Sequence, residues 1–306
     1  MIKEFVNKLI LTPVFATLLL AGCHEKVDWD APPFESKPVM NSILFPGKPV
    51  KVHVSLAVPY GANKSIIVED AEVNLFVDGA FAETLVYQEK GYYQSQLVAE
   101  IEKEYVCEVR VDNYTVVSGS TTIPKPVKIL GVEHINIAGV DEEALTYPAV
   151  KITFENRPGI FTCHEVIINM LKPVWGGGSA WNRARIFEYI DPVLLNEGLP
   201  ISVFSNEIIE NDSYSMTINY TTGSYFSKDR GPMVTRLYPL KVEFRTLSHS
   251  YYHYTRQLFL YEYNNDEPFF SGTVLTPFTL YSNIENGYGI FTSYSSVTSS
   301  IIYPED

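Results

Sequence analysis

Basic residues are scarce in this sequence, which has 23 Lys and Arg against 36 Asp and Glu and a formal net charge of −13. Nucleic-acid binding needs a basic patch that neutralises phosphates, so this balance argues against such a partner. Cysteine is rare, with 3 in 306 residues, and no apolar run after Cys23 is long enough to span a bilayer. What is present is 46% hydrophobic residues, with 21 Tyr and 17 Phe against 5 Met. This composition is ample for packed cores and favours strands over helices.

The first 23 residues resemble a bacterial lipoprotein signal. Lys3 and Lys8 form a positively charged start, an apolar stretch covers 9–20, and the segment ends in Leu20-Ala21-Gly22-Cys23. In such signals the peptide before the Cys is removed and the Cys thiol receives a diacylglycerol. A short transmembrane anchor is the alternative, but the apolar stretch is well below the ~20 residues that cross a bilayer. We expect a signal peptide over 1–22 and a three-chain lipid anchor on Cys23, which attaches the protein permanently.

Residues 23–37 form an acidic, proline-containing tether, in which carboxylates are interspersed before Pro32-Pro33. The segment is similar to the acidic signals after the lipidated Cys that send Bacteroidota lipoproteins to the outer face of the outer membrane. An ordinary charged linker that extends by self-repulsion explains it equally well. The expected location is the outer membrane, with the chain lipid-anchored and exposed at the cell surface, while the leaflet stays open.

Residues 38–126 predict an immunoglobulin-like or transthyretin-like β-sandwich. Apolar residues alternate with polar ones over 50–56, 71–77 and 105–111, which is the pattern of half-buried strands. Asp78-Gly79 lies between two such runs and predicts a tight hairpin turn. Ile123-Pro124-Lys125-Pro126 ends the module, because proline cannot donate to a sheet.

Residues 127–306 predict a larger β-rich domain with one amphipathic helix at about 249–263. Its expected strands are 150–154, 160–170, 201–204, 213–220, 240–245, 273–280 and 290–293. Ser248 is a good N-cap, and apolar residues recur after it at helical spacing. Cys107 reads as a buried apolar residue of its strand and Cys163 falls in a different domain, although the sequence leaves open whether they pair.

The tail of the chain carries the most specific motif. It is Tyr281-Ser282-Asn283-Ile284-Glu285-Asn286-Gly287-Tyr288-Gly289-Ile290-Phe291, preceded by Arg245-Thr246-Leu247-Ser248 and Asn265-Asp266-Glu267-Pro268-Phe269, with Phe204-Ser205-Asn206-Glu207 in the middle of the chain. These residues resemble a Bacteroidota lipoprotein family filed as domain of unknown function 4249. The resemblance implies an envelope lipoprotein, often associated with TonB-dependent transporters, without an established activity.

Two groups of residues are candidates for sites. Trp175 and Trp181 flank a Gly176-Gly177-Gly178 loop and are candidate ligand contacts, because sugar rings and peptide side chains stack on indoles; a mobile connector is the other interpretation. The signature residues are read as structural, since Asn and Gly also serve tight turns. They are Asn283, Glu285, Asn286, Gly287, Gly289 and Phe291.

Motifs for catalysis and cofactors are missing. The sequence has no Gly-x-Ser-x-Gly, no Ser-x-x-Lys acylation motif and no phosphate loop, and its carboxylate pairs are no more than any acidic protein offers. His249 and His253 stand at i, i+4, the spacing that lets two imidazoles share a metal, but no third ligand is apparent. We expect no catalytic, cofactor-binding or metal-binding residue.

Three functions remain for this sequence. The leading one is a non-enzymatic outer-membrane surface lipoprotein that serves as an accessory or docking subunit of an envelope complex. A TonB-dependent transporter as its partner is implied by the resemblance alone. A direct glycan- or peptide-binding surface lipoprotein is the alternative, and an envelope hydrolase is the third. The sequence names neither ligand nor oligomeric state.

Overall fold

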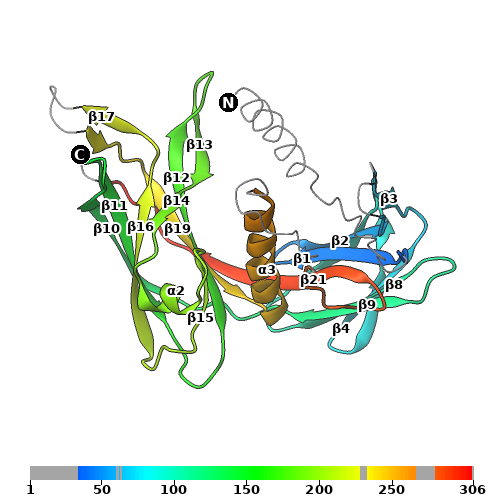
Figure 1. Cartoon of the computed structure of the whole chain (residues 1–306). Helices are drawn as coiled ribbons and strands as arrows, with labels where there is room; N and C mark the ends of the chain where they lie inside the picture. The colour runs from blue at the N-terminus through cyan, green and yellow to red at the C-terminus, as the bar shows by residue number, and fades with distance from the viewer. Residues whose placement is uncertain (1–33, 60–61, 63, 228–232, 267–279, 305–306) are drawn as a thin grey trace, which may run out of the picture. The chain divides into compact units, whose positions relative to one another are not determined.

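A computed structural model describes residues 34–59, 62, 64–227, 233–266 and 280–304. The predicted signal peptide, Cys23, most of the tether and residues 273–279 of an expected strand lie outside this range. Strands dominate the described residues, which confirms the mainly β fold (Figure 1). Among the described helices, none is long and apolar enough to cross a membrane.

The first sandwich packs two antiparallel groups of strands face to face. One group is β1 (Pro38–Leu44), β2 (Pro49–Leu56), β3 (Ile66–Ile67), β6 (Val86–Tyr87) and β7 (Tyr92–Val98). The other is β4 (Glu72–Val77), β5 (Ala80–Thr84), β8 (Glu104–Arg110), β9 (Val117–Thr122) and β20 (Ile284–Glu285). The core between them is apolar and includes Val52, Leu75 and Val109, each fully buried.

The period-two patterns explain these strands. Val50, Val52 and Val54 of β2 are buried, whereas Lys51 between them is exposed. Asp78-Gly79 joins β4 to β5 with φ of 50° and 79°, the positive values that a type I′ turn requires at both central residues. The predicted hairpin is therefore confirmed.

The second sandwich packs a four-stranded sheet against an extension of the first sandwich's β1 sheet. The four strands are β10 (Ile129–Val140), β11 (Thr146–Glu155), β16 (Ser213–Thr221) and β14 (Arg185–Glu188). The facing strands are β13 (Ser179–Arg183), β12 (Cys163–Pro173), β15 (Val203–Ser205) and β19 (Leu240–Leu247). A separate pair is β17 (Tyr225–Ser227) with β18 (Met233–Thr235). The second core includes Ile152, Phe154, Ile168, Met216 and Phe244.

One long strand serves both sandwiches. β21 (Tyr288–Thr298, red in Figure 1) pairs in parallel with β1 through its first half and antiparallel with β19 through its second half. Phe291 and Ile284 lie in the first core, although they are far along the chain from the other residues of that core. The C-terminal segment therefore completes the sandwich that residues 38–126 begin.

Two helices lie among the described residues of the second half. α2 (Pro192–Asn196) is a single short turn capped by Asp191, whose Oδ1 accepts from Val193 N at 3.0 Å. α3 (His249–Asp266) begins where predicted and ends three residues later than expected. Ser248 is its N-cap, since Ser248 Oγ accepts from Tyr251 N at 3.3 Å.

Candidate functional site

The tail signature lies between β1, β9 and the start of β21. Asn283 Nδ2 donates to Phe291 O at 2.8 Å and to Ser120 O at 3.1 Å, while its Oδ1 accepts from Phe291 N at 2.9 Å. One amide side chain thus satisfies backbone groups from two strands. Its role is to hold the C-terminal strand in the first sandwich.

The other polar and glycine residues of the signature also serve backbone conformation and packing. Asn286 adopts φ of 59° and donates from Nδ2 to Val116 O at 3.2 Å, and Glu285 accepts weakly from Ser118 Oγ at 3.4 Å. Gly289 has φ of 107°, and a Cβ there would lie 2.2 Å from Met40 O. A Cβ at Gly287 would lie 2.6 Å from Pro38 O, so both glycines permit close approach to β1. Gly287 itself has no positive φ, and β20 pairs with β9, so Asn286-Gly287 does not form a type I′ hairpin turn.

The two candidate tryptophans lie on the β12–β13 hairpin. Trp175 is fully exposed beside three glycines with positive φ. Trp181 lies on β13 opposite Leu171, is 38% exposed, and has Lys241 Nζ 4.5 Å from its ring centre. Neither indole lines either of the two clefts described below.

A groove opens at the end of the second sandwich, between β12–β13 and β14–β16. Its volume is about 800 Å³. We call it the mouth groove; its lining includes Met170, Lys172, Asn182, Arg183, Arg185, Phe187, Thr222 and Tyr225, but neither tryptophan. Every charged lining residue is a cation, in a protein with a net charge of −13. Lys172 Nζ donates to Thr222 O at 2.6 Å, and Arg183 forms an ion pair with Glu165. Among the three cations of the groove, Arg185 therefore has the fewest hydrogen bonds and ion pairs in the described structure.

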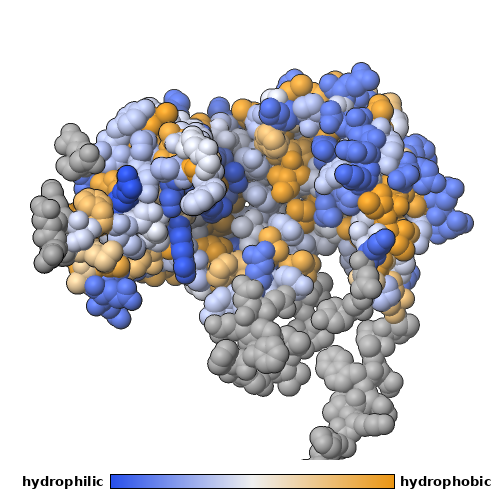
Figure 2. Space-filling model, turned by 90° about the horizontal axis from the view of Figure 1, so that it is seen from above, coloured by the Kyte–Doolittle hydropathy of each residue, from blue (hydrophilic) through white to orange (hydrophobic). Residues whose placement is uncertain are grey.

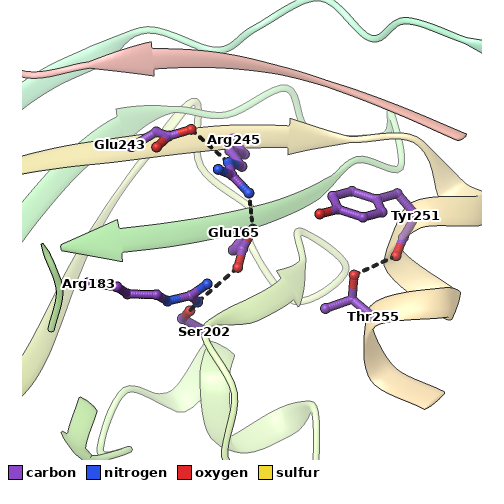
Figure 3. Close-up of polar contacts among 7 residues, drawn as sticks. All are labelled: Glu165, Arg183, Ser202, Glu243, Arg245, Tyr251 and Thr255. Atoms are coloured by element: carbon purple, nitrogen blue, oxygen red, sulfur yellow. Dashed lines mark hydrogen bonds and ion pairs between the residues drawn. The ribbon is translucent and has the colours of Figure 1, made fainter. Parts of the chain in front are cut away.

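Arg183 belongs to an ion-pair network under α3 (Figure 3). Glu165, whose side chain is 6% exposed, receives Arg183 Nη2 at 2.9 Å on one oxygen and Arg245 Nη1 at 3.2 Å on the other. Arg245 Nε also donates to Glu243 at 2.7 Å. Glu165 lies at the floor of a smaller cleft of about 340 Å³ between the sheet and α3. Because its two oxygens pair with arginines from two different strands, Glu165 links β12 to β13 and β19.

A second buried carboxylate fastens α3 to the segment before β15. Glu197 accepts from Ser205 N at 2.6 Å, from Ser205 Oγ at 3.1 Å and from Tyr252 Oη at 2.5 Å, and it pairs with Arg256. Burial, followed by the bond to Glu197, raises the pKa of Tyr252. This network explains Ser205 in the mid-chain motif.

Asn206, the next residue of that motif, closes the loop before β12. Its Nδ2 donates to Asn156 Oδ1 and to Ile160 O, each at 2.9 Å, and its Oδ1 accepts from Thr162 N at 2.9 Å. The motif is thus a set of buried hydrogen bonds rather than an open site.

The remaining titratable candidates fall into three places. Cys107 and Cys163 are free and buried, and burial raises the pKa of both thiols, that of Cys163 to about 12. His164 is fully buried beside Phe154 and Phe244, and burial lowers its pKa to about 3. The carboxylate pairs of the sequence, such as Glu142 with Glu143 and Glu207 with Glu210, are exposed.

The two histidines at the start of α3 lie within hydrogen-bond distance of each other. His249 Nε2 and His253 Nε2 are 3.1 Å apart. Groups of three or more His, Cys, Asp or Glu side chains that could hold a metal are absent from the part of the chain that the structure describes.

Comparison with known proteins gives a family but little else. No curated protein sequence matches the chain. A crystal structure described as a membrane anchored protein of Corynebacterium diphtheriae aligns at 12% identity and a TM-score of 0.21. The alignment covers 72% of this chain and 56% of that one, and at this score it carries no argument. The profile of the domain of unknown function DUF4249 matches residues 24–300. The chain therefore belongs to the DUF4249 family, as its tail signature indicated.

Proposed function

We propose that this protein is an outer-membrane surface lipoprotein, anchored through Cys23, that acts as a non-enzymatic accessory or docking subunit of an envelope complex. The observation that carries the proposal is Leu20-Ala21-Gly22-Cys23 directly before the start of the family match at residue 24. A lipidated first residue and a family region that begins at the next position fit one processed chain. A TonB-dependent transporter is the partner that the family resemblance favours.

The tether length sets where a partner must lie. Residues 24–35 separate the anchor from the unit that starts at Ser36. A fully extended stretch of this length reaches at most about 40 Å. The two sandwiches therefore stay close to the membrane surface, at a high effective concentration toward any membrane partner, so even a weak interface is occupied.

The best candidate for a docking surface is the free side of β10, which we call the β10 edge. β10 is the terminal strand of its sheet and runs for 12 residues, about twice the usual strand length. It contains no Lys, Arg or Pro; of the features that protect an exposed edge, it has one charged residue, Glu133, and two register shifts. Leu130, Ile137 and Val140 are each more than half exposed along it.

Apolar residues also lie on other parts of the surface. Figure 2 shows orange apolar patches between blue hydrophilic areas on one face of the protein. An open edge adds unpaired backbone donors and acceptors to apolar side chains, which makes it able to accept a strand from a partner. β5 and β6 are also terminal strands with exposed apolar residues, but they have only 5 and 2 residues, so the 12-residue β10 edge offers the longest strand for pairing.

The anchor is tested by labelling cells with a palmitate analogue and fractionating their membranes. Wild-type protein should carry the label and sediment with the outer membrane, and Cys23→Ala should lose both properties. Labelled protein from the Cys23→Ala variant would contradict the anchor.

The docking role is tested by pulling tagged protein from solubilised outer membranes. Wild type should recover one envelope protein in stoichiometric amount, and the double variant Leu130→Lys/Ile137→Lys should lose it. A matched control, Phe81→Lys/Val86→Lys in the first sandwich, replaces equally exposed apolar residues on β5 and β6. Recovery of no partner by wild type, or equal loss in the control, would count against the proposal.

A second candidate function, direct ligand binding, is favoured by the mouth groove. Its cations and its aromatic residues suit a sugar chain that carries carboxylates. Oligogalacturonate serves as the probe, and it should bind wild type but bind Arg185→Glu at least about tenfold more weakly. Arg110→Glu, on an exposed strand residue of the first sandwich, is the matched control. Equal affinity for wild type and Arg185→Glu would remove the groove from consideration.

A further inference from the structure

The imidazoles of His249 and His253 lie in an arrangement that the sequence spacing only suggested. Their ring centres are 4.3 Å apart, the ring planes meet at 74°, and the two Nε2 atoms are 3.1 Å from each other. Both residues are on the first two turns of α3, and His249 is exposed. Two neutral imidazoles at this distance share one proton in a hydrogen bond.

Aromatic neighbours hold both rings. Phe161 meets His249 edge-on at 5.8 Å, and Tyr281 stacks on His253 at 5.6 Å with an interplanar angle of 29°. These contacts come from the loop before β12 and from the segment that leads into the tail signature. The rings are therefore positioned by three parts of the chain, which reduces the entropy lost when a ligand fixes them.

We propose that His249 and His253 form a two-imidazole site for a borderline divalent transition-metal ion, Zn²⁺, Ni²⁺ or Cu²⁺. Two nitrogens bound to one tetrahedral zinc at about 2.0–2.1 Å stand about 3.3 Å apart. The observed 3.1 Å needs an adjustment of only a few tenths of an ångström. Water, or a donor group from a docked partner, completes the coordination.

A metal ion can replace the hydrogen bond between the two imidazoles without a net loss of protons. Metal binding requires a free lone pair on each Nε2, and each neutral imidazole can carry its proton on Nδ1 instead. The shared Nε2 proton therefore moves to Nδ1 of the same ring without net release.

Other ligating groups of the described chain are poorly placed to compete. His134 uses Nε2 toward Tyr220 Oη at 2.9 Å and Nδ1 toward Asn136 at 2.8 Å. His164 and the two buried thiols are enclosed in the cores. Imidazole ligands select late transition metals over Mg²⁺, which prefers oxygen.

Calorimetric titration of the lipidated mature protein in detergent tests the site, with ZnCl₂ and NiCl₂ as ligands and MgCl₂ as the negative control. All proteins carry His24→Ala, so that the imidazole beside Cys23 does not contribute. We expect one saturable Zn²⁺ per chain, weakened at least about tenfold, or about 1.4 kcal/mol, by His249→Ala or by His253→Ala. His53→Gln is the matched control and should leave the affinity unchanged.

Thermal unfolding gives an independent readout. Zn²⁺ should raise the melting temperature of the reference protein, because it binds only the folded chain at this site, and should leave that of His253→Ala unchanged. Absence of saturable Zn²⁺ binding, or the same affinity in both His→Ala variants as in the reference, would overturn the proposal. Neither outcome depends on whether the β10 edge binds a partner.

Discussion

The two sandwiches bury different kinds of polar side chain. In the described first sandwich, the buried polar side chains are hydroxyls and one amide, such as Ser95, Thr121 and Asn74. In the second half, the buried set includes His164, Glu165, Asp191 and Glu197. The first sandwich therefore depends on packing and backbone fit, whereas the second depends on charge pairing and is expected to respond to pH.

Breaking the charge pairing of the second half should have the largest effect. Glu197→Gln leaves Arg256 without its buried counter-ion and should destabilise the protein by about 3–5 kcal/mol. Urea unfolding measures this loss. Glu207→Gln, an exposed carboxylate near the same motif, is the matched control and should change stability by less than about 0.5 kcal/mol. Equal stability of the two variants would mean that the Glu197 network contributes nothing.

Breaking backbone fit in the first sandwich should come next. Gly289→Ala places a Cβ 2.2 Å from Met40 O at a φ of 107°, and we expect a loss of about 3 kcal/mol. Gly47→Ala shares a positive φ but has nothing within 4 Å, so it should cost about 1 kcal/mol. The difference, measured by urea unfolding, isolates the close approach of β21 to β1. Similar losses for both variants would show that this contact is not tight.

The pH response sharpens the comparison. The pKa of His164 falls from 6.5 to about 3 on folding, so the unfolded chain binds the extra proton and stability is lost as pH falls below 6.5. The slope should approach about 1.4 kcal/mol per pH unit, or about 2 kcal/mol between pH 6.5 and 5.

Asp191 acts in the opposite direction, because burial raises its pKa above the ordinary value and folding then favours the protonated form. Burial also lowers the pKa of His53 and of His134, so these rings act in the same direction as His164. His164→Gln should flatten the stability curve between pH 6.5 and 5 more than His53→Gln does, because His164 is fully buried and His53 only partly. An unchanged slope in His164→Gln would assign the acid sensitivity to another group.

The smallest expected effect concerns the N-cap of α3. Ser248→Ala removes the N-cap of α3 and should cost about 1 kcal/mol. Ser250→Ala, two residues later and not capping the helix, should cost less. Thermal unfolding distinguishes the two, and an equal loss would mean that the hydroxyl cluster with Thr292 matters more than the cap.

Local patterns predicted the parts of the fold that local physics decides. Alternation found β2, β4 and β8, and Ser248 marked the start of α3. β10 was missed because Glu133, His134 and Asn136 place polar residues on both faces, so no regular alternation marks the strand. The parallel pairing of β21 with β1 joins residues about 250 positions apart, which no local period can show.

Local patterns likewise predicted only part of the candidate sites. The structural interpretation of Asn283 and Gly289 fits their contacts, but the buried Glu165 and Glu197 were not recognised. Glu165 stands within Cys163-His164-Glu165-Val166-Ile167-Ile168, and a lone carboxylate in such an apolar run signals a buried charge that needs a partner. The identity of its arginines depends on the pairing of β12 with β13 and β19, which only the structure supplies.

The central claim is that the anchored protein docks to an envelope partner through the β10 edge. Its most direct measurement is photo-crosslinking in intact cells with a photoreactive amino acid at position 137, compared with the same group at the exposed position 66 on β3. The account predicts one discrete crosslinked envelope protein from position 137, lost in Cys23→Ala, and none from position 66. No crosslink from position 137, or the same product from both positions, would contradict it.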